Sequence, residues 1–291
     1  MSEPATRTLD VPGAVVTYDV RAPERPGPAP TLLMIASPMG AAGFDTLSGY
    51  FADRTVVTYD PRGVERSRLT GDADPATPAT HADDLHRLVD ALGSGRVDVF
   101  ASSGGAVNAL AWVAAHPDDV ATLVAHEPPL AGVLPDAEVM VAAMHANHEL
   151  YLAKGWGAAM AQFIALTSHT GPLPSDWLDR AAPDPATFGL PTEDDGSRDD
   201  PLFGVNMVTL PSFMPDLRAV AAAPTRVVLA AGEDSAGQMT ARSAVAVAER
   251  LGTTPVVFPD GHAGFLGGEY GQTGQPEAFA ATLREVLDAP R

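Results

Sequence analysis

Short apolar runs alternate along this chain with longer segments whose apolar positions recur at helical spacing. The runs have the composition of strands and cover residues 15–20, 31–37, 55–60, 97–102, 122–127, 226–232 and 255–259. The longer segments cover residues 78–92, 104–116, 238–251 and 275–287 and have the period of helices. Such alternation is typical of a mostly parallel central sheet flanked by helices, so we predict an α/β fold.

This alternation stops between residues 131 and 223. That stretch contains expected helices at 136–153, 156–166 and 201–217, rich in Met and aromatic residues, but no clear strand. We therefore predict one core, formed by residues 1–130 and 224–291, with a helical insertion at 131–223. The 291 residues suffice for one large domain of this kind.

Composition and charge exclude several classes of function. The 37 acidic and 18 basic residues give a net charge of −19, which argues against nucleic acid as a partner. The absence of cysteine excludes disulfides, thiolate catalysis and sulfur-ligated metals. The first residues lack the apolar core of a signal peptide, and no segment approaches the ~18 apolar residues of a membrane span. We expect a cytoplasmic protein that does not enter a membrane.

One serine stands where a strand meets a helix. Ser103 follows the run 97–102 and precedes the helical segment 104–116, with Ala101 and Gly105 two residues to either side. A turn this tight requires small neighbours, and it directs the first amides of the helix toward whatever lies beside the hydroxyl. Those amides suit a developing oxyanion, so Ser103 is the candidate nucleophile.

The last two strands lead into polar residues that a serine nucleophile needs. The run 226–232 is followed by Glu233 and Asp234, and the run 255–259 is followed closely by His262. Parallel strands end at one edge of a sheet, so Ser103, Asp234 and His262 are expected to converge there. A neutral histidine accepts the serine proton, and a carboxylate on its other nitrogen fixes the tautomer.

Taken together, these motifs resemble those of proteins with the α/β-hydrolase fold, and the similarity covers nearly the whole chain. Residues 60–67 read Asp-Pro-Arg-Gly-Val-Glu-Arg-Ser, similar to the family segment Asp-x-Arg-Gly-x-Gly-x-Ser, with Glu65 in place of the second glycine. The insertion falls where this family carries a helical cap over its active site. The resemblance implies the fold, the nucleophile elbow at Ser103 and a cap at 131–223.

The sequence leaves more than one candidate for the triad acid and for the second donor of the oxyanion hole. Asp234 is our first choice of acid, with Glu233 beside it and Glu127 at the end of the run 122–127 as alternatives. In some haloalkane dehalogenases of this fold the acid stands where Glu127 stands. The oxyanion hole is expected to use the amides of Gly104 and of Met39, since Pro38 has no N–H to donate.

These residues predict a serine hydrolase that cleaves a carboxylic ester, lactone or thioester of a small to medium apolar molecule through an acyl-enzyme on Ser103. Two alternatives use the same pocket: a natural-product tailoring enzyme that performs elimination or cyclisation, and a small-molecule receptor with an idle triad. No metal-ligand spacing or dinucleotide motif occurs, so no cofactor and no metal are expected. Substrate identity and oligomeric state do not follow from the sequence.

Overall fold

A single mixed sheet organises the molecule. Residues 3–23, 27–71 and 75–290 are described by this computed structural model, and within them nine strands form one sheet in the order β1-β2-β4-β3-β6-β7-β8-β9, with β5 paired to β2. The strands are β1 (Ala5–Val11), β2 (Ala14–Arg21), β3 (Leu32–Ile35), β4 (Val56–Tyr59), β5 (Arg68–Leu69), β6 (Val97–Ser102), β7 (Val120–His126), β8 (Arg226–Gly232) and β9 (Val256–Phe258). Those from β4 through β9 along this order pair in parallel, while β1, β2 and β5 are antiparallel. The predicted fold class is confirmed.

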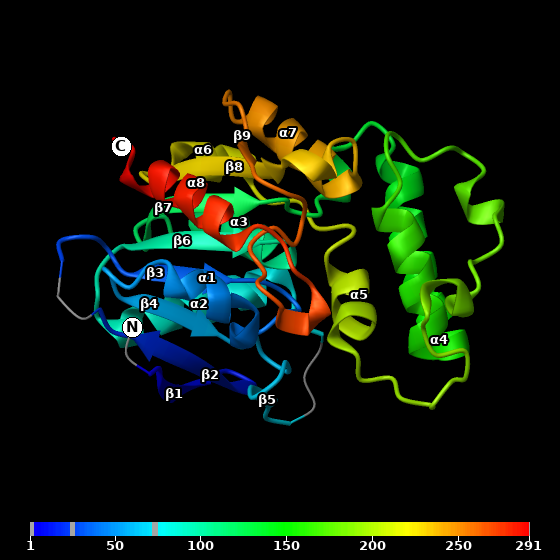
Figure 1. Cartoon of the computed structure of the whole chain (residues 1–291), viewed down its shortest axis with the longest axis horizontal. Coiled ribbons are helices and arrows are strands. Elements are labelled where there is room, and N and C mark those ends of the chain that lie inside the picture. The colour runs from blue at the N-terminus through cyan, green and yellow to red at the C-terminus, as the bar shows by residue number, and fades with distance from the viewer. Residues whose placement is uncertain (1–2, 24–26, 72–74, 291) are drawn as a thin grey trace.

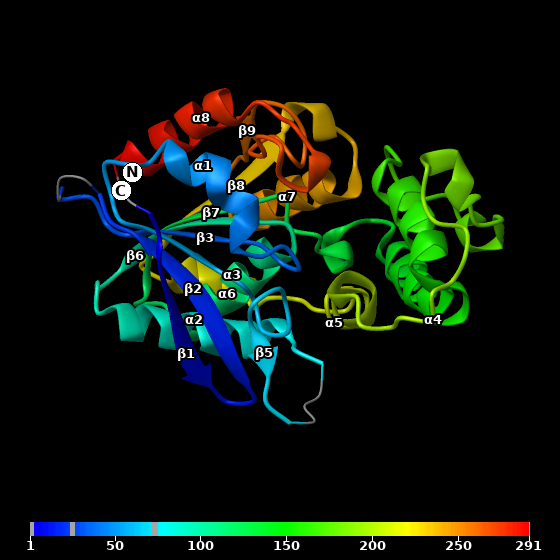
Figure 2. The same cartoon turned by 60° about the horizontal axis from the view of Figure 1, so that its bottom comes forward.

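Helices cover both faces of the sheet (Figure 2). On one face lie α1 (Asp45–Gly49) and α8 (Pro276–Asp288), whose apolar residues share a core cluster with Phe100 and Phe258. The opposite face contacts α2 (Pro78–Leu92), α3 (Gly104–Ala115), α6 (Leu217–Ala222) and α7 (Met239–Arg250). The central strands are covered on both faces, which explains why their sequences are mostly apolar.

Helix α2 shows how the sequence sets element boundaries. Thr77 caps its first turn by accepting the Thr80 amide, and Pro78 occupies the first helical position. Gly93, with φ of 61°, closes the helix in the left-handed conformation that glycine adopts without strain. The prediction of a helix over 78–92 is confirmed.

The segment between β7 and β8 extends beyond the carboxyl edge of the sheet (Figure 1). It contains η2 (Ala131–Val133), α4 (Ala137–Thr167), η3 (Trp177–Asp179), η4 (Pro185–Phe188), the π-helix η5 (Leu202–Asn206) and α5 (Met207–Thr209). Helix α4 breaks at Gly155, where φ is 80°. The single helix predicted over 201–217 is wrong, because the chain leaves helical conformation after Thr209 and α6 then packs against α3.

The division into core and cap at 130/131 and 223/224 stays a prediction. Its outer limits, residues 1 and 291, lie outside the described residues. Among the helices that are described, none combines the length and apolar character needed to cross a membrane.

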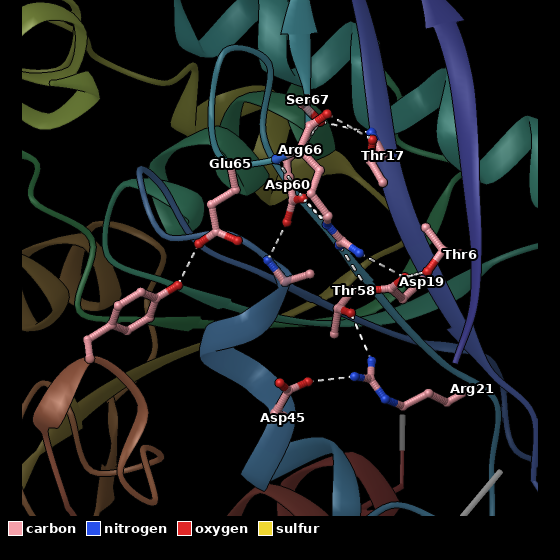
Figure 3. A network of polar contacts seen from close by, with 12 residues as sticks. Thr6, Thr17, Asp19, Arg21, Asp45, Thr58, Asp60, Glu65, Arg66 and Ser67 are labelled. Carbon is pink, nitrogen blue, oxygen red and sulfur yellow. Dashed lines mark hydrogen bonds and ion pairs between the residues drawn. The ribbon is translucent and has the colours of Figure 1, made fainter. Parts of the chain in front are cut away.

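Polar contacts hold the loop after β4, residues 60–67, against the antiparallel strands (Figure 3). Asp60 is fully buried and accepts hydrogen bonds from the Ala41 amide at 2.7 Å and from the Arg66 guanidinium at 2.6 Å. Arg66 also pairs with Asp19 on β2, and the Ser67 hydroxyl donates to the Asp60 carbonyl. Because Ala41 begins η1 (Ala41–Phe44), this network fixes the far end of the loop that contains Met39.

Candidate active site

Ser103 lies at a sharp turn between β6 and α3. Its φ of 56° is in the left-handed region that non-glycine residues rarely adopt, and its amide donates to the His126 carbonyl at 3.0 Å. A Cβ atom at Gly105 would lie 2.5 Å from Cα of Ala36, which follows β3. The close approach of α3 to β3 therefore explains why a small residue follows the serine by two positions.

The carboxylate that contacts His262 is that of Glu127. His262 lies on the loop after β9, and its Nδ1 is 2.5 Å from Oε2 of Glu127, at the end of β7. Glu127 is fully buried, whereas the His262 side chain is 41% exposed. The Gly232 amide donates to Oε1 and the Thr240 hydroxyl donates to Oε2, each at 2.9 Å. This contact leaves Nε2 of His262 for a nucleophile.

The prediction that Asp234 contacts His262 is wrong for this structure. Asp234 and Glu233 belong to η6 (Glu233–Ser235) and are exposed. Strand β7 lies between β6 and β8, and Glu127, which follows β7, reaches His262, whereas Glu233 and Asp234 after β8 are exposed. Gly232, the last residue of β8, contributes its amide to the site. Glu127, weighed as an alternative, is the carboxylate brought to the histidine.

Glu127 is ionised in this setting. Burial raises its pKa, but the hydrogen bond and the charge of His262, together with His126 and the Gly232 amide, lower it to about 2. His126 is itself fully buried, and burial lowers its pKa to about 4, so His126 is neutral near pH 7. A buried anion therefore faces Nδ1 of His262 across the working pH range.

The loop after β3 lies against the start of α3. The Ser37 carbonyl oxygen would lie 2.6 Å from a Cβ atom at Gly104. Met39 and Ser103 line one cavity, and Gly104 and Ser103 line another. The two predicted oxyanion donors thus belong to segments that meet beside Ser103.

Sequence reasoning missed Asn206. This buried residue ends the π-helix η5, and its Nδ2 lies 3.2 Å from the Ser37 hydroxyl. Single-turn π-helices occur frequently at functional sites, but the sequence carries no signal for one here. Asn206 connects the segment beyond the sheet edge to the loop that contains Met39.

Two cavities meet at Ser103 and His262, which line both. The smaller, about 180 Å³, is the more enclosed, and most of its surface is apolar, with Met144, Phe163 and Leu210 among the residues that line it. The larger, about 600 Å³, extends past Met39. Within the described chain the Ser103 hydroxyl is not hydrogen-bonded to His262, a contact that often tightens only when substrate is bound.

Strained backbone gathers around these cavities. Among the described residues, five non-glycine residues have positive φ: Glu65, Ser103, Glu127, Asp260 and Tyr270. Ser103, Glu65 and Tyr270 line the cavities, Glu127 contacts His262, and Asp260 is two residues before His262. Such strain persists only where the surrounding structure enforces it, and it marks functional sites.

Among the described residues, one group of potential metal ligands lies on α2 and just after the end of α3, outside the cavities that Ser103 lines. His86, His116 and Asp119 have ligand atoms within 4.8 Å of one another. The two imidazole rings, however, stack 4.0 Å apart and are nearly parallel, so their nitrogen lone pairs do not converge on one point. The group provides no metal site in this arrangement.

Comparison with known proteins identifies the family. The model of the alpha/beta hydrolase fold family matches residues 41–203, more than half of the chain. The chain belongs to the alpha/beta hydrolase fold family. A relative from Bacillus subtilis, the uncharacterized hydrolase YraK, is 31% identical over 97% of this chain and 95% of its own.

Solved structures show the same alpha/beta hydrolase architecture. A thermophilic esterase from Thermogutta terrifontis superposes with a TM-score of 0.67 at 18% identity, over 98% of both chains. The enol-lactonase from Burkholderia xenovorans superposes with a TM-score of 0.65 at 17% identity, over 97% of this chain and all of its own. At these identities the neighbours show the fold alone. Family membership supports a hydrolase of the alpha/beta fold type.

Proposed function

We propose that the chain is a serine hydrolase that cleaves a carboxylic ester, lactone or thioester. Ser103 is the nucleophile, His262 transfers the proton and Glu127 orients His262. The amides of Gly104 and Met39 bind the oxyanion. The observation that carries the proposal is the contact between the buried Glu127 carboxylate and His262, which lines both cavities together with Ser103.

In the first half-reaction Oγ of Ser103 attacks the carbonyl carbon while Nε2 of His262 accepts the hydroxyl proton. The bond to the leaving group then breaks, and His262 gives the proton to the departing oxygen or sulfur. In the second half-reaction His262 accepts a proton from water, which attacks the acyl-enzyme. His262 then returns the proton to Oγ of Ser103 as the acid product leaves. Glu127, with its pKa of about 2, stays negative beside Nδ1 and stabilises the imidazolium formed in both steps.

The apolar lining of the smaller cavity supports an apolar acyl group. Its side chains include Met144, Met207 and Met239, whose flexible thioethers adapt to irregular ligands. Two solved structures of the same fold are named esterase and enol-lactonase, so esters and lactones lead the classes to screen.

The test is covalent labelling by a fluorophosphonate probe, read by mass spectrometry of the intact protein and its peptides. We expect one adduct, on Ser103, that disappears in Ser103→Ala and is strongly reduced in His262→Ala. Ser102→Ala is the matched control, because Ser102 is adjacent but contacts His126. The adduct on Ser103 should persist in Ser102→Ala.

Labelling of another residue, or labelling that survives in Ser103→Ala, would refute the acyl-enzyme. No adduct, combined with a ligand-dependent rise in melting temperature and no turnover, would instead favour a small-molecule receptor. Conversion of a ligand without net hydrolysis would favour elimination or cyclisation in the same pocket.

A further inference from the structure

The larger cavity at Ser103 has an acidic and aromatic wall. Glu65, Tyr270 and Trp156 line it together with Asp200, and no Lys or Arg is among the described residues that line it. The chain as a whole has a net charge of −19. A ligand group that enters this cavity therefore meets negative charge and aromatic surface beside the reacting atoms.

Glu65 differs from its acidic neighbours because it has no cationic partner. Asp19 and Asp60 pair with Arg66, and Asp45 pairs with Arg21. In the described structure Glu65 has no ion pair, and its one hydrogen bond comes from the Tyr270 hydroxyl at 2.7 Å. Figure 3 shows Glu65 beside this ion-pair network rather than within it.

Asp200 is already engaged. Its Oδ1 accepts the Leu202 and Phe203 amides, and its Oδ2 accepts the Trp156 indole N–H at 3.0 Å. These bonds fix the Trp156 ring at the cavity wall. Glu65 is thus the carboxylate available to a ligand, and Tyr270, which contacts it, and Trp156 are aromatic side chains that line the same cavity.

The backbone holds Glu65 and Tyr270 in costly conformations. Their φ angles are 47° and 54°, a left-handed region that is strained for non-glycine residues and persists only where the surrounding structure enforces it. Burial and the bond to Glu65 raise the pKa of Tyr270, so its hydroxyl remains a donor. A Cβ atom at Gly40 would lie 2.7 Å from the Glu65 carboxyl carbon, which puts this carboxylate against the loop that contains Met39.

We propose that the larger cavity is a leaving-group subsite for an alkylammonium cation, with Glu65 as the counter-ion and Trp156 and Tyr270 as cation–π partners. This inference rests on the proposed function. The acyl group must stay bound until water attacks, which suits the enclosed cavity, whereas the leaving group must depart first, which suits the open one. The preferred substrates are then esters or thioesters of amino alcohols or quaternary ammonium alcohols.

A pair of isosteric substrates isolates the charge. Butyrylthiocholine and S-(3,3-dimethylbutyl) thiobutyrate differ by a positive nitrogen in place of a neutral carbon, and both release a thiol that is measured directly. We expect kcat/KM to favour the cation by about fivefold or more at low ionic strength, since both an ion pair and cation–π contacts contribute. The preference should shrink as salt screens the exposed carboxylate.

Glu65→Gln keeps the shape and the tyrosine contact but removes the charge, so it should reduce the preference severalfold while kcat on the neutral thioester changes little. Glu285→Gln is the matched control, because it removes an exposed negative charge on α8 outside the cavity. Its preference should equal that of the wild type. A neutral thioester cleaved as well as the cationic one, or a preference unchanged in Glu65→Gln, would overturn the subsite.

Binding without turnover separates this inference from the proposed function. Ligand-observed NMR with choline and with 3,3-dimethylbutanol reports occupancy even if no ester is cleaved. We expect choline to bind more tightly, and only while Glu65 is present. Glu65-dependent choline binding in a protein that no fluorophosphonate labels would refute the serine mechanism and keep the cation site. If Ser103 is labelled but both alcohols bind equally well, the serine mechanism is kept and the cation site is refuted.

Discussion

Replacing Glu127 by Gln is the most direct perturbation of the candidate site. The pKa of this carboxyl is about 2 in place of 4.5, which corresponds to roughly 3 kcal/mol of net stabilisation of the carboxylate by its surroundings. The hydrogen bond and the charge of His262 are the largest of the contributions that lower this pKa. A glutamine at this position is neutral, so the imidazolium formed during proton transfer loses its counter-ion.

The amide also changes the tautomer. When a glutamine N–H₂ group donates to Nδ1, the ring proton moves to Nε2, and His262 no longer accepts a proton from Ser103. Both effects act on the transition state, so we expect kcat to fall by about 10²–10⁴-fold with KM nearly unchanged. The assay is turnover of a chromogenic butyrate ester under saturating substrate, together with the melting temperature of each variant.

Asp234→Asn is the comparison variant, because this exposed carboxyl also follows a strand at the same edge of the sheet. Its kcat should stay within about twofold of the wild type, as for most surface substitutions. If Asp234→Asn loses as much activity as Glu127→Gln, or if Glu127→Gln keeps more than a tenth of the wild-type kcat, the assignment of Glu127 fails.

Three other results are expected. Burial lowers the pKa of His81 and of His126 from 6.5 to about 4, so the unfolded state takes up protons first as pH falls. The free energy of unfolding should therefore fall between pH 6.5 and pH 4, by up to roughly 3 kcal/mol for each histidine. Chemical denaturation measured across this range should show a smaller fall in His81→Gln than in the wild type. Gly105→Ala should lower the melting temperature by several degrees, because the added Cβ atom would meet the Ala36 backbone. Gly252→Ala is the control: its added Cβ atom would meet no other atom, so any loss of stability there reports the strain of a positive φ alone. Asn206→Ala should reduce kcat/KM roughly fivefold through loss of the Ser37 contact, and unchanged kinetics would exclude a positioning role.

The parts of the fold that the sequence predicts are those with a burial pattern. Strands β3, β4, β6 and β7 are buried at every position and read as mainly apolar runs, interrupted by single polar residues such as Asp98 and Thr122. Strand β1 is almost entirely exposed and carries polar residues, so it gives no such signal. The short β5 is exposed as well and is held by pairing to β2.

The end of the predicted helix over 201–217 fails for a local reason. Asp200 caps a π-helix through the Leu202 and Phe203 amides, and Pro211 and Pro215 prevent the chain from continuing in helical form. Periodicity alone does not reveal a π-helix, so the position of Asn206 beside Ser37 was not predictable. That contact depends on where the segment after β7 folds back onto the sheet edge.

The choice between Asp234 and Glu127 depends on geometry that two strand ends do not reveal. Both residues follow strands that end at one edge, so the sequence gives each a route to His262. The structure separates them by what each strand end contributes: the residue after β7 supplies a carboxylate, and Gly232, the last residue of β8, supplies the amide that holds it. Because that amide already occupies Oε1 of Glu127, both strand ends act on the same carboxylate, and a second acid from β8 would meet it as a like charge.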